Sequence, residues 1–171
     1  RSRYNHRDAS QLLEEALKAA PGDPNTLVEL AAVDVESDRD YARATDRLRE
    51  VIQAAPQCLP AHNLLARIDL ENERPQAAIK RLLKTSLKIA PQDPKGLALL
   101  ATAHALLDDM DAFSDVERRV LKVHPRAASF YTTVSEHLSR MHRYAEAAAL
   151  DERAIALDPE HWKAYTSLGI G

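Results

Sequence analysis

The sequence predicts an all-α protein, a solenoid of stacked antiparallel helix hairpins, on the strength of three observations. The composition is 45% hydrophobic but only 5% aromatic, with four glycines. A chain rich in alanine and leucine favours helices, because strands are enriched in β-branched and aromatic residues. The other two observations are sets of residues that recur along the chain with one shared period.

Prolines follow apolar helical runs at a nearly constant spacing. Successive members are 35, 35, 34 and 34 residues apart, and the series is Pro21, Pro56, Pro91, Pro125 and Pro159. Each closes a run such as RLREVIQAAP. Proline cannot extend a helix and disfavours the α conformation of the residue before it, so each one marks a helix end. The chain is therefore predicted to repeat every 34 or 35 residues.

Pairs of one large and one small residue recur with the same period. These pairs are Leu30-Ala31, Leu65-Ala66, Leu100-Ala101, Val134-Ser135 and Leu168-Gly169. A further series, mostly alanine, consists of Ala9, Ala44, Ala78, Phe113 and Ala147. Small side chains let two helices approach toward the short end of the roughly 8–10 Å packing range. The two series predict a first and a second helix in each repeat, packed on each other.

Local signals define the individual helices. Asp23-Pro24 and Asp93-Pro94 have the form of an N-cap carboxylate followed by proline at the first helical position, and Pro75 can open a helix in the same way. Loops of two to five residues suit antiparallel neighbours. The predicted helices span 8–20, 24–36, 41–55, 60–72, 75–89, 94–107, 110–123, 127–140, 143–156 and 160–170.

These residues resemble the tetratricopeptide repeat family, whose signature is a helical hairpin of about 34 residues. In the best copy, residues 129–159, the matching positions are Tyr131, Val134, Ser135, Leu138, Tyr144, Ala147, Ala154 and Pro159. The resemblance covers the whole chain and implies a right-handed α-α superhelix. It predicts a single solenoid over 1–171, with a lone second helix (1–21), full repeats (24–56, 59–91, 94–125, 128–159) and the first helix of a truncated fifth repeat (160–171).

Two repeats carry 35 residues, and the extra residue lies in different places. From Ala31 to Ala44 there are 13 residues against 12 elsewhere, which puts the first insertion in the turn ESDRDY. From Ala78 to Pro91 there are again 13 against 12, which puts the second insertion within or at the end of a helix. An extra residue inside a helix rotates all later residues of that helix by about 100° unless a π-bulge absorbs it. We expect that helix to be irregular.

The third repeat and the chain ends depart from the family pattern. Phe113 stands where the family has a small residue, and Glu117 where it has a large apolar one, so we expect looser or shifted packing there. The last helix lacks a following partner, which predicts that Trp162 and Leu168 are partly bare. Because terminal repeats normally need a polar cap, we expect self-association through these incomplete repeats.

Charge and composition disfavour several classes of partner. The net charge is −3 from 23 basic and 26 acidic residues, interspersed without a polybasic tract, so neither nucleic acid nor a membrane surface is expected. Cys58 is the only cysteine, which excludes an internal disulfide and a thiolate metal cage. No apolar run approaches ~18 residues and no secretory signal opens this stretch, which favours a cytoplasmic location for the fragment.

No catalytic motif is present. The chain has no H-E-x-x-H, no G-x-S-x-G, no P-loop and no dinucleotide fingerprint, so we predict neither an enzyme nor a cofactor. Asp34, Asp69 and His104 form a column at steps of 35, for which we expect pairing with neighbouring arginine or lysine. A metal site is the alternative, although repeats about 10 Å apart strain coordination of one ion.

The resemblance also implies a function, the binding of a peptide in a concave groove lined by the first helices. Its partner-binding residues would be Asn63, Arg67, Glu71, Thr102, Thr132, Glu136 and Arg140, with Val28, Ala32, Val35, Ala98, Leu106 and Thr166 completing the lining. The lysine–asparagine clamp of some members is absent, since Val28 and Ala32 occupy its places. We expect a non-catalytic scaffold that binds a protein or peptide.

A second reading places this segment in a larger enzyme. Residues 139–171 are similar to bacterial proteins in which such repeats precede a peptidase-MA-like zinc metallohydrolase domain. The catalytic domain would then lie beyond Gly171, and this segment would remain a binding module.

Overall fold

Helices make up most of the chain in the computed structural model, which describes residues 2–169 and the side chains of residues 8–37 and 39–169. Ten continuous helical segments and no strand occur in this range. The elements are α1 (Ser2–Ala19), α2 (Pro24–Val33), η1 (Asp34–Asp38), α3 (Tyr41–Ala54), α4 (Leu59–Glu71), α5 (Pro75–Arg81), η2 (Leu82–Ser86), α6 (Leu87–Ile89), α7 (Pro94–Leu106), α8 (Met110–Val123), α9 (Ala128–Arg140), α10 (Tyr144–Leu157) and α11 (Trp162–Leu168). The predicted all-α class is confirmed.

The predicted helix limits agree with the structure to within two residues, with one exception. Helix α1 begins at Ser2, whereas the sequence pattern predicts a start at residue 8. The opening residues RSRYNHR lack an apolar period, so pattern alone cannot detect a helix there. Residues 170 and 171, at the end of the last predicted helix, lie outside the described range.

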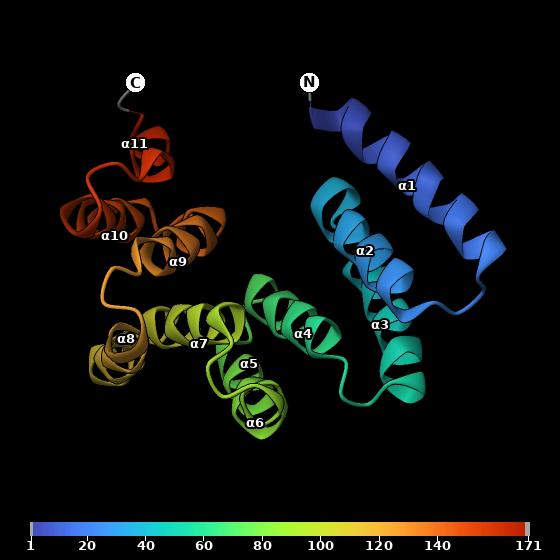
Figure 1. Cartoon of the computed structure of the whole chain (residues 1–171), viewed down its shortest axis with the longest axis horizontal. Coiled ribbons are helices and arrows are strands. Elements are labelled where there is room, and N and C mark those ends of the chain that lie inside the picture. The colour runs from blue at the N-terminus through green and yellow to red at the C-terminus, as the bar shows by residue number, and fades with distance from the viewer. Residues whose placement is uncertain (1, 170–171) are drawn as a thin grey trace. The chain divides into compact units, whose positions relative to one another are not determined.

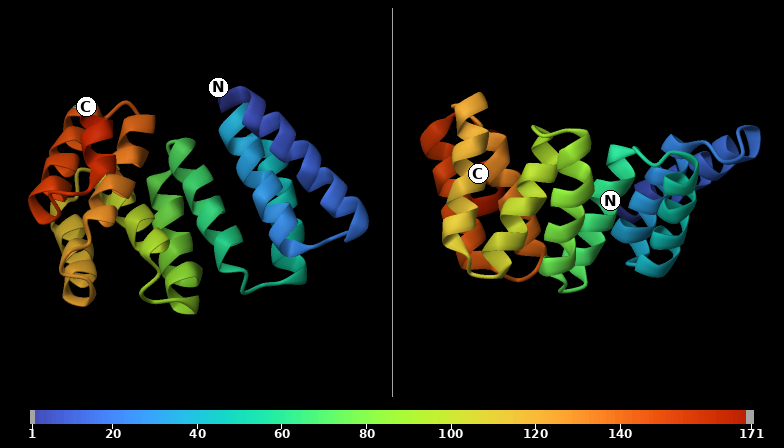
Figure 2. Two further views of the ribbon diagram at one scale, coloured as in Figure 1. Left: turned by 45° about the horizontal axis from the view of Figure 1, so that its top comes forward. Right: turned by 90° about the horizontal axis from the view of Figure 1, so that it is seen from below.

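Two compact units, residues 1–68 and 69–171, divide the chain within α4. In the first unit, α1 lies along α2, and α2 pairs with α3 as an antiparallel hairpin (Figure 1). In the second unit, α7 pairs with α8 and α9 with α10, while α7 also contacts α5 and α9. The hairpin partners stay side by side in the further views (Figure 2). No helix in the described part of the chain is long and apolar enough to cross a bilayer.

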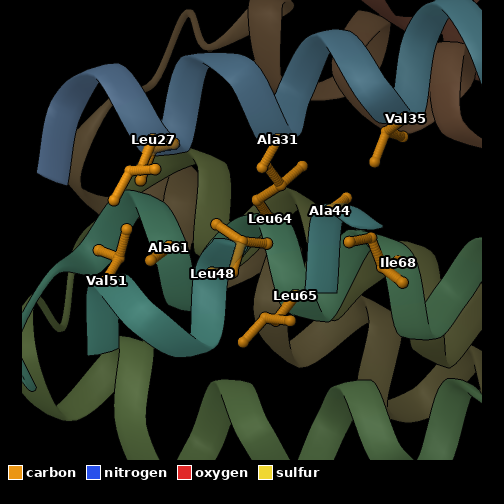
Figure 3. Packing of buried hydrophobic residues seen from close by; sticks show 11 residues of the cluster. Leu27, Ala31, Val35, Ala44, Leu48, Val51, Ala61, Leu64, Leu65 and Ile68 are labelled. Atoms are coloured by element: carbon orange, nitrogen blue, oxygen red, sulfur yellow. The ribbon is translucent and has the colours of Figure 1, made fainter. Parts of the chain in front are cut away.

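Small residues stand where the helices of a hairpin meet. In the first unit, Ala31 of α2 and Ala44 of α3 are fully buried, and Leu27 and Leu48 pack around them (Figure 3). Ala61 of α4 belongs to the same cluster and is also fully buried. Because these residues add almost no bulk, the larger leucines of neighbouring turns interdigitate at close range. The recurring small residues of the sequence are thus core contacts.

The predicted N-caps are present. The Asp23 carboxylate accepts hydrogen bonds from the backbone N–H of Thr26 at 2.8 Å and from its hydroxyl at 2.7 Å. These bonds lower the pKa of the Asp23 carboxyl below its ordinary value. Asp93 accepts from the N–H of Gly96 at 2.6 Å. Each aspartate satisfies an otherwise unpaired donor at the first turn of α2 or α7.

Each of the four first helices from α2 to α9 is followed closely by a residue in the left-handed conformation. These residues are Arg39, Glu73, Asp108 and His142, with φ between 52° and 63°, and none of them is glycine. Their spacing of 34, 35 and 34 residues follows the repeat. The conformation turns the chain sharply into the second helix, where glycine is usually favoured because it has no Cβ.

Both extra residues are absorbed in π-helical turns. The turn Leu82–Ser86 interrupts the second helix of the second repeat, which confirms the predicted irregular helix. Residues after it keep their register, since Leu87 is buried. The other turn, Asp34–Asp38, lies at the end of the first helix of repeat one. The sequence pattern put the first insertion in the turn ESDRDY, and the structure corrects this in part. The chain widens the end of the first helix instead of lengthening the loop beyond it.

Deletion of Lys84, an exposed residue of the π-helical turn, is expected to be tolerated. Losing one residue there converts the turn to regular α-helix and leaves later residues facing the core. The melting temperature should change by no more than about 4 °C. Deletion of Arg118, an exposed residue of the regular helix α8, is the control. It rotates the following turn by about 100° and should lower the melting temperature by at least about 10 °C. Equal losses from both deletions would contradict this account.

Replacing Glu73 by glycine should stabilise the protein. The exposed Glu73 adopts φ of 57°, which costs an L-residue energy that glycine avoids. Glu73→Ala removes the same side chain but keeps the Cβ, so it serves as the matched reference. We expect Glu73→Gly to exceed Glu73→Ala in unfolding free energy by about 0.5–1 kcal/mol in urea denaturation. A glycine variant less stable than the alanine variant would show that the conformation is not strained.

Candidate functional site on the first helices

The seven predicted partner-binding residues differ in how much surface they present. They lie on the first helices, with Asn63, Arg67 and Glu71 on α4, Thr102 on α7, and Thr132, Glu136 and Arg140 on α9. Asn63, Thr102 and Thr132 are buried, Arg67 and Glu71 are partly exposed, and Glu136 and Arg140 are exposed. Charged positions therefore offer most of the accessible polar surface in this set.

The two threonines are satisfied locally. The Thr102 hydroxyl donates to the carbonyl of Ala98 at 2.8 Å, one turn earlier in α7. The Thr132 hydroxyl donates to the carbonyl of Ser129 at 3.2 Å and lies 3.2 Å from the His161 Nε2. Both hydroxyls are thus satisfied within the protein, and the burial of these two threonines leaves them little surface for a ligand.

In the first unit, Arg67 of α4 contacts the end of the preceding first helix. Its Nη1 donates to Glu36 Oε1 at 3.1 Å. Sequence reasoning named Val35 for this part of the lining, but Val35 is buried in the core cluster. Glu36 lies within the π-helical turn, 35 residues before Glu71. This 35-residue step between the two glutamates is the sequence pattern that could have identified Glu36 as part of the lining.

In the second unit, Glu71 and Arg140 approach each other across a whole intervening repeat. Glu71 is the last residue of α4, Arg140 is the last residue of α9, and Arg140 Nη1 lies 3.9 Å from Glu71 Oε1. Flat packing at 8–10 Å per helix would separate these two helices by roughly 16–20 Å. The two long side chains nevertheless bring their charged groups to within 3.9 Å of each other.

The column of Asp34, Asp69 and His104 is paired chiefly with arginine, as predicted. In the first unit, Asp34 accepts from the Arg43 Nε at 2.8 Å and the Arg47 Nε at 2.9 Å, with a further contact to the Arg43 Nη2. In the second unit, Asp69 pairs with the Arg74 Nη2 at 3.0 Å and the Arg81 Nε at 3.1 Å. Both carboxylates are buried, so each needs this compensation.

His104 is the exception, because its partner is an acid. Its Nδ1 lies 3.6 Å from Asp109 Oδ2. Among the described residues, no three side chains of histidine, cysteine, aspartate or glutamate group so as to hold a metal ion.

The fourth repeat fills the corresponding positions without charge. Leu138 replaces the column aspartate and Leu150 replaces the arginine that Arg47 and Arg81 supply, and both leucines are buried. The hairpin therefore forms with either an ion pair or two apolar side chains at this place. The ion pair is one of two solutions to the same packing problem.

The unusual residues of the third repeat have defined roles. Phe113 is fully buried, with its ring centroid 6.4 Å from that of Phe130. Glu117 accepts from the Tyr131 hydroxyl at 2.7 Å and from Arg153 Nη1 at 2.9 Å. Burial, and after it the bond to Glu117, raises the pKa of the Tyr131 hydroxyl above its ordinary value. Glu117 thus ties α8 to the following hairpin where the family has an apolar contact.

Consecutive helix hairpins with small residues at their crossings define a helical-repeat protein. A family model described as the tetratricopeptide repeat matches residues 2–68 and 36–103, more than half of the chain. The chain belongs to the tetratricopeptide repeat family. A search of curated proteins finds no significant match.

Solved structures with the same fold share little sequence with this chain. A thermophilic TPR protein of Thermus thermophilus is 19% identical, with a TM-score of 0.72, covering 96% of this chain and 90% of that one. PilW, a type IV pilus biogenesis factor, is 14% identical with a TM-score of 0.69, covering 98% and 80%. YrrB is 16% identical with a TM-score of 0.58, covering 97% and 84%. At these identities the likeness concerns the fold.

A double-mutant cycle on Asp69 and Arg81 should separate the contribution of the ion pair to stability from that of side-chain packing. Asp69→Leu alone leaves Arg81, two-thirds buried, without its carboxylate, and should destabilise the protein by roughly 1–3 kcal/mol in urea denaturation. Adding Arg81→Leu reproduces the Leu138 and Leu150 arrangement, and should return the stability to within about 1 kcal/mol of the starting protein. If the double variant is no more stable than the single one, the two solutions are not interchangeable.

Proposed function

We propose that this chain is a non-catalytic protein-binding scaffold whose first helices present a groove to an extended or helical peptide. Membership in the tetratricopeptide repeat family supports a role in protein interaction, since stacked repeats form extended concave surfaces. YrrB, which shares the fold, is described as a TPR protein with an unusual peptide-binding site. The proposal extends that kind of role to this chain on the geometry of its own residues.

The contact between Glu71 and Arg140 is the observation that carries this proposal. Charged groups of the second and fourth repeats come within 3.9 Å of each other in the second unit. Such an approach supports a first-helix face that curves inward at this end, because a convex face would hold the two residues apart. A concave face lets a ligand contact several helices at once.

The charges on this face favour a ligand that carries groups of both signs. Arg140 and Glu136 are exposed, and at 3.9 Å the contact of Arg140 with Glu71 is loose. The Arg140 side chain is 44% exposed, so a carboxylate of the ligand can reach it from solvent, whereas the Glu71 side chain is 11% exposed. Glu136 is then available for a basic group one turn away on α9.

The alternative, in which this segment belongs to a peptidase-MA-like enzyme, stays a prediction. Reading the parent gene beyond Gly171 for an H-E-x-x-H motif tests it directly. Either outcome is compatible with a binding role for residues 1–171.

Charge reversal on the first helices tests the proposal. Peptides selected on the immobilised chain from a random display library are measured by calorimetry against Arg140→Glu. We expect affinity to fall by about ten-fold or more, because a ligand carboxylate then faces a like charge. Arg118→Glu is the matched control, since this arginine is exposed on a second helix of the same unit and pairs with Asp115, three residues away. If both variants bind the peptides as the unaltered chain does, the groove assignment is wrong.

A further inference from the structure

A pocket of about 370 Å³ lies outside the candidate groove, within the second unit. It opens between the start of α7, the end of α8 and the start of α9, and none of the seven predicted partner-binding residues lines it. Its buried apolar walls come from Leu97, Val120 and Phe130, and Val123 is half exposed at its edge. The volume and the walls suit one bulky apolar side chain.

The rim of this pocket is basic. Lys95, His124 and Arg126 line it and are exposed, and no aspartate or glutamate belongs to the lining. Lys95 and Arg126 form no ion pair with any side chain that the structure describes. The nearest carboxylate along the chain, Asp93, is turned toward the N–H of Gly96. The complementary ligand is therefore an apolar side chain flanked by carboxylates.

The chain itself carries such a segment at residues 107–111, with the sequence LDDMD. Leu107 is 37% exposed and Met110 is 54% exposed, which is unusual for large apolar residues. Asp108 pairs with Arg143 and Asp109 caps the N–H of Ala112, while both stay exposed; Asp111 is exposed as well. No other exposed large apolar residue in the described chain has three carboxylates within a five-residue stretch.

The segment and the pocket lie at opposite ends of the α7–α8 hairpin. The pocket uses the first residues of α7 and the last residues of α8, whereas residues 107–111 include the turn that joins the other two ends. A helix of 13 residues separates them by about 20 Å. One copy of the chain therefore cannot fill its own pocket.

We propose that residues 107–111 of one copy of this chain dock in the pocket of a second copy. Met110 enters between Leu97, Val120 and Phe130. The aspartates beside it face Lys95 and Arg126. The two surfaces differ, so the contact is head to tail, and each added copy leaves one pocket and one segment free. This surface is distinct from the terminal repeat, where Trp162 is exposed.

Sedimentation velocity on the full chain and two complementary variants tests this proposal. The pocket variant carries Lys95→Glu and Arg126→Glu, and the segment variant carries Met110→Lys and Asp111→Lys; all four positions are exposed. For the unaltered chain, the mean mass should rise with concentration up to about 1 mM and pass that of a dimer, more strongly at low salt. Each variant alone should remain a monomer. An equimolar mixture should form a dimer and nothing larger, because only one matching pair of surfaces is left.

Two control variants distinguish this contact from other causes of association. Arg118→Glu with Lys122→Glu makes the same charge change on exposed positions of α8 that do not line the pocket, and association should persist. Trp162→Ser should leave it unchanged as well. Circular dichroism confirms that every variant is folded. The proposal is overturned if the unaltered chain stays monomeric, if the pocket variant still associates, if the mixture forms no dimer, or if Trp162→Ser abolishes association.

Discussion

Close contact between two helices at a position almost without side-chain bulk is the interaction on which each hairpin depends. Ala31 and Ala44 are both fully buried where α2 meets α3, and the leucines around them pack only because the backbones approach so closely. The third repeat shows that the rule concerns shape. Phe113 takes the small position there and is just as buried, with the ring of Phe130 beside it. A large side chain is accommodated where a neighbouring helix is arranged around it.

The same contact also limits the length of the repeat. Each small residue must return to its partner helix, so an added residue cannot simply lengthen a helix without turning the following positions out of the core. The two π-helical turns remove this conflict at Asp34–Asp38 and Leu82–Ser86. In each case the widened turn absorbs one residue, and the apolar positions after it remain buried, as Ala44 and Leu87 are. Irregular local structure therefore preserves regular packing.

This coupling of period and packing explains what sequence reasoning could predict. The family, the fold class and the irregular helix follow from the repeat spacing, because a buried contact in each repeat leaves a periodic pattern in the sequence. The N-caps and helix limits follow from local signals such as Asp23-Pro24. Residues on the accessible face of the first helices show a weaker periodic pattern in the sequence. Val35 was placed on that face and lies in the core, while Glu36 contacts Arg67, because counting residues along an ideal helix fails inside a π-helical turn. Spacing likewise cannot tell that Thr102 is buried while Glu136, at the corresponding position of the fourth repeat, is exposed, since α7 and α9 pack against different neighbouring helices.

Buried and exposed ion pairs in this chain serve different ends. Asp34 accepts hydrogen bonds from two arginines and is almost fully buried, so removing its partners would leave an uncompensated charge in the interior. Glu71 and Arg140 are farther apart, and the Arg140 side chain is 44% exposed, so Arg140 remains accessible to a ligand. A ligand can compete for the second kind of pair but not for the first. The column of aspartates belongs to the stability of the hairpins, and recognition falls to the loosely held charges at the ends of the first helices.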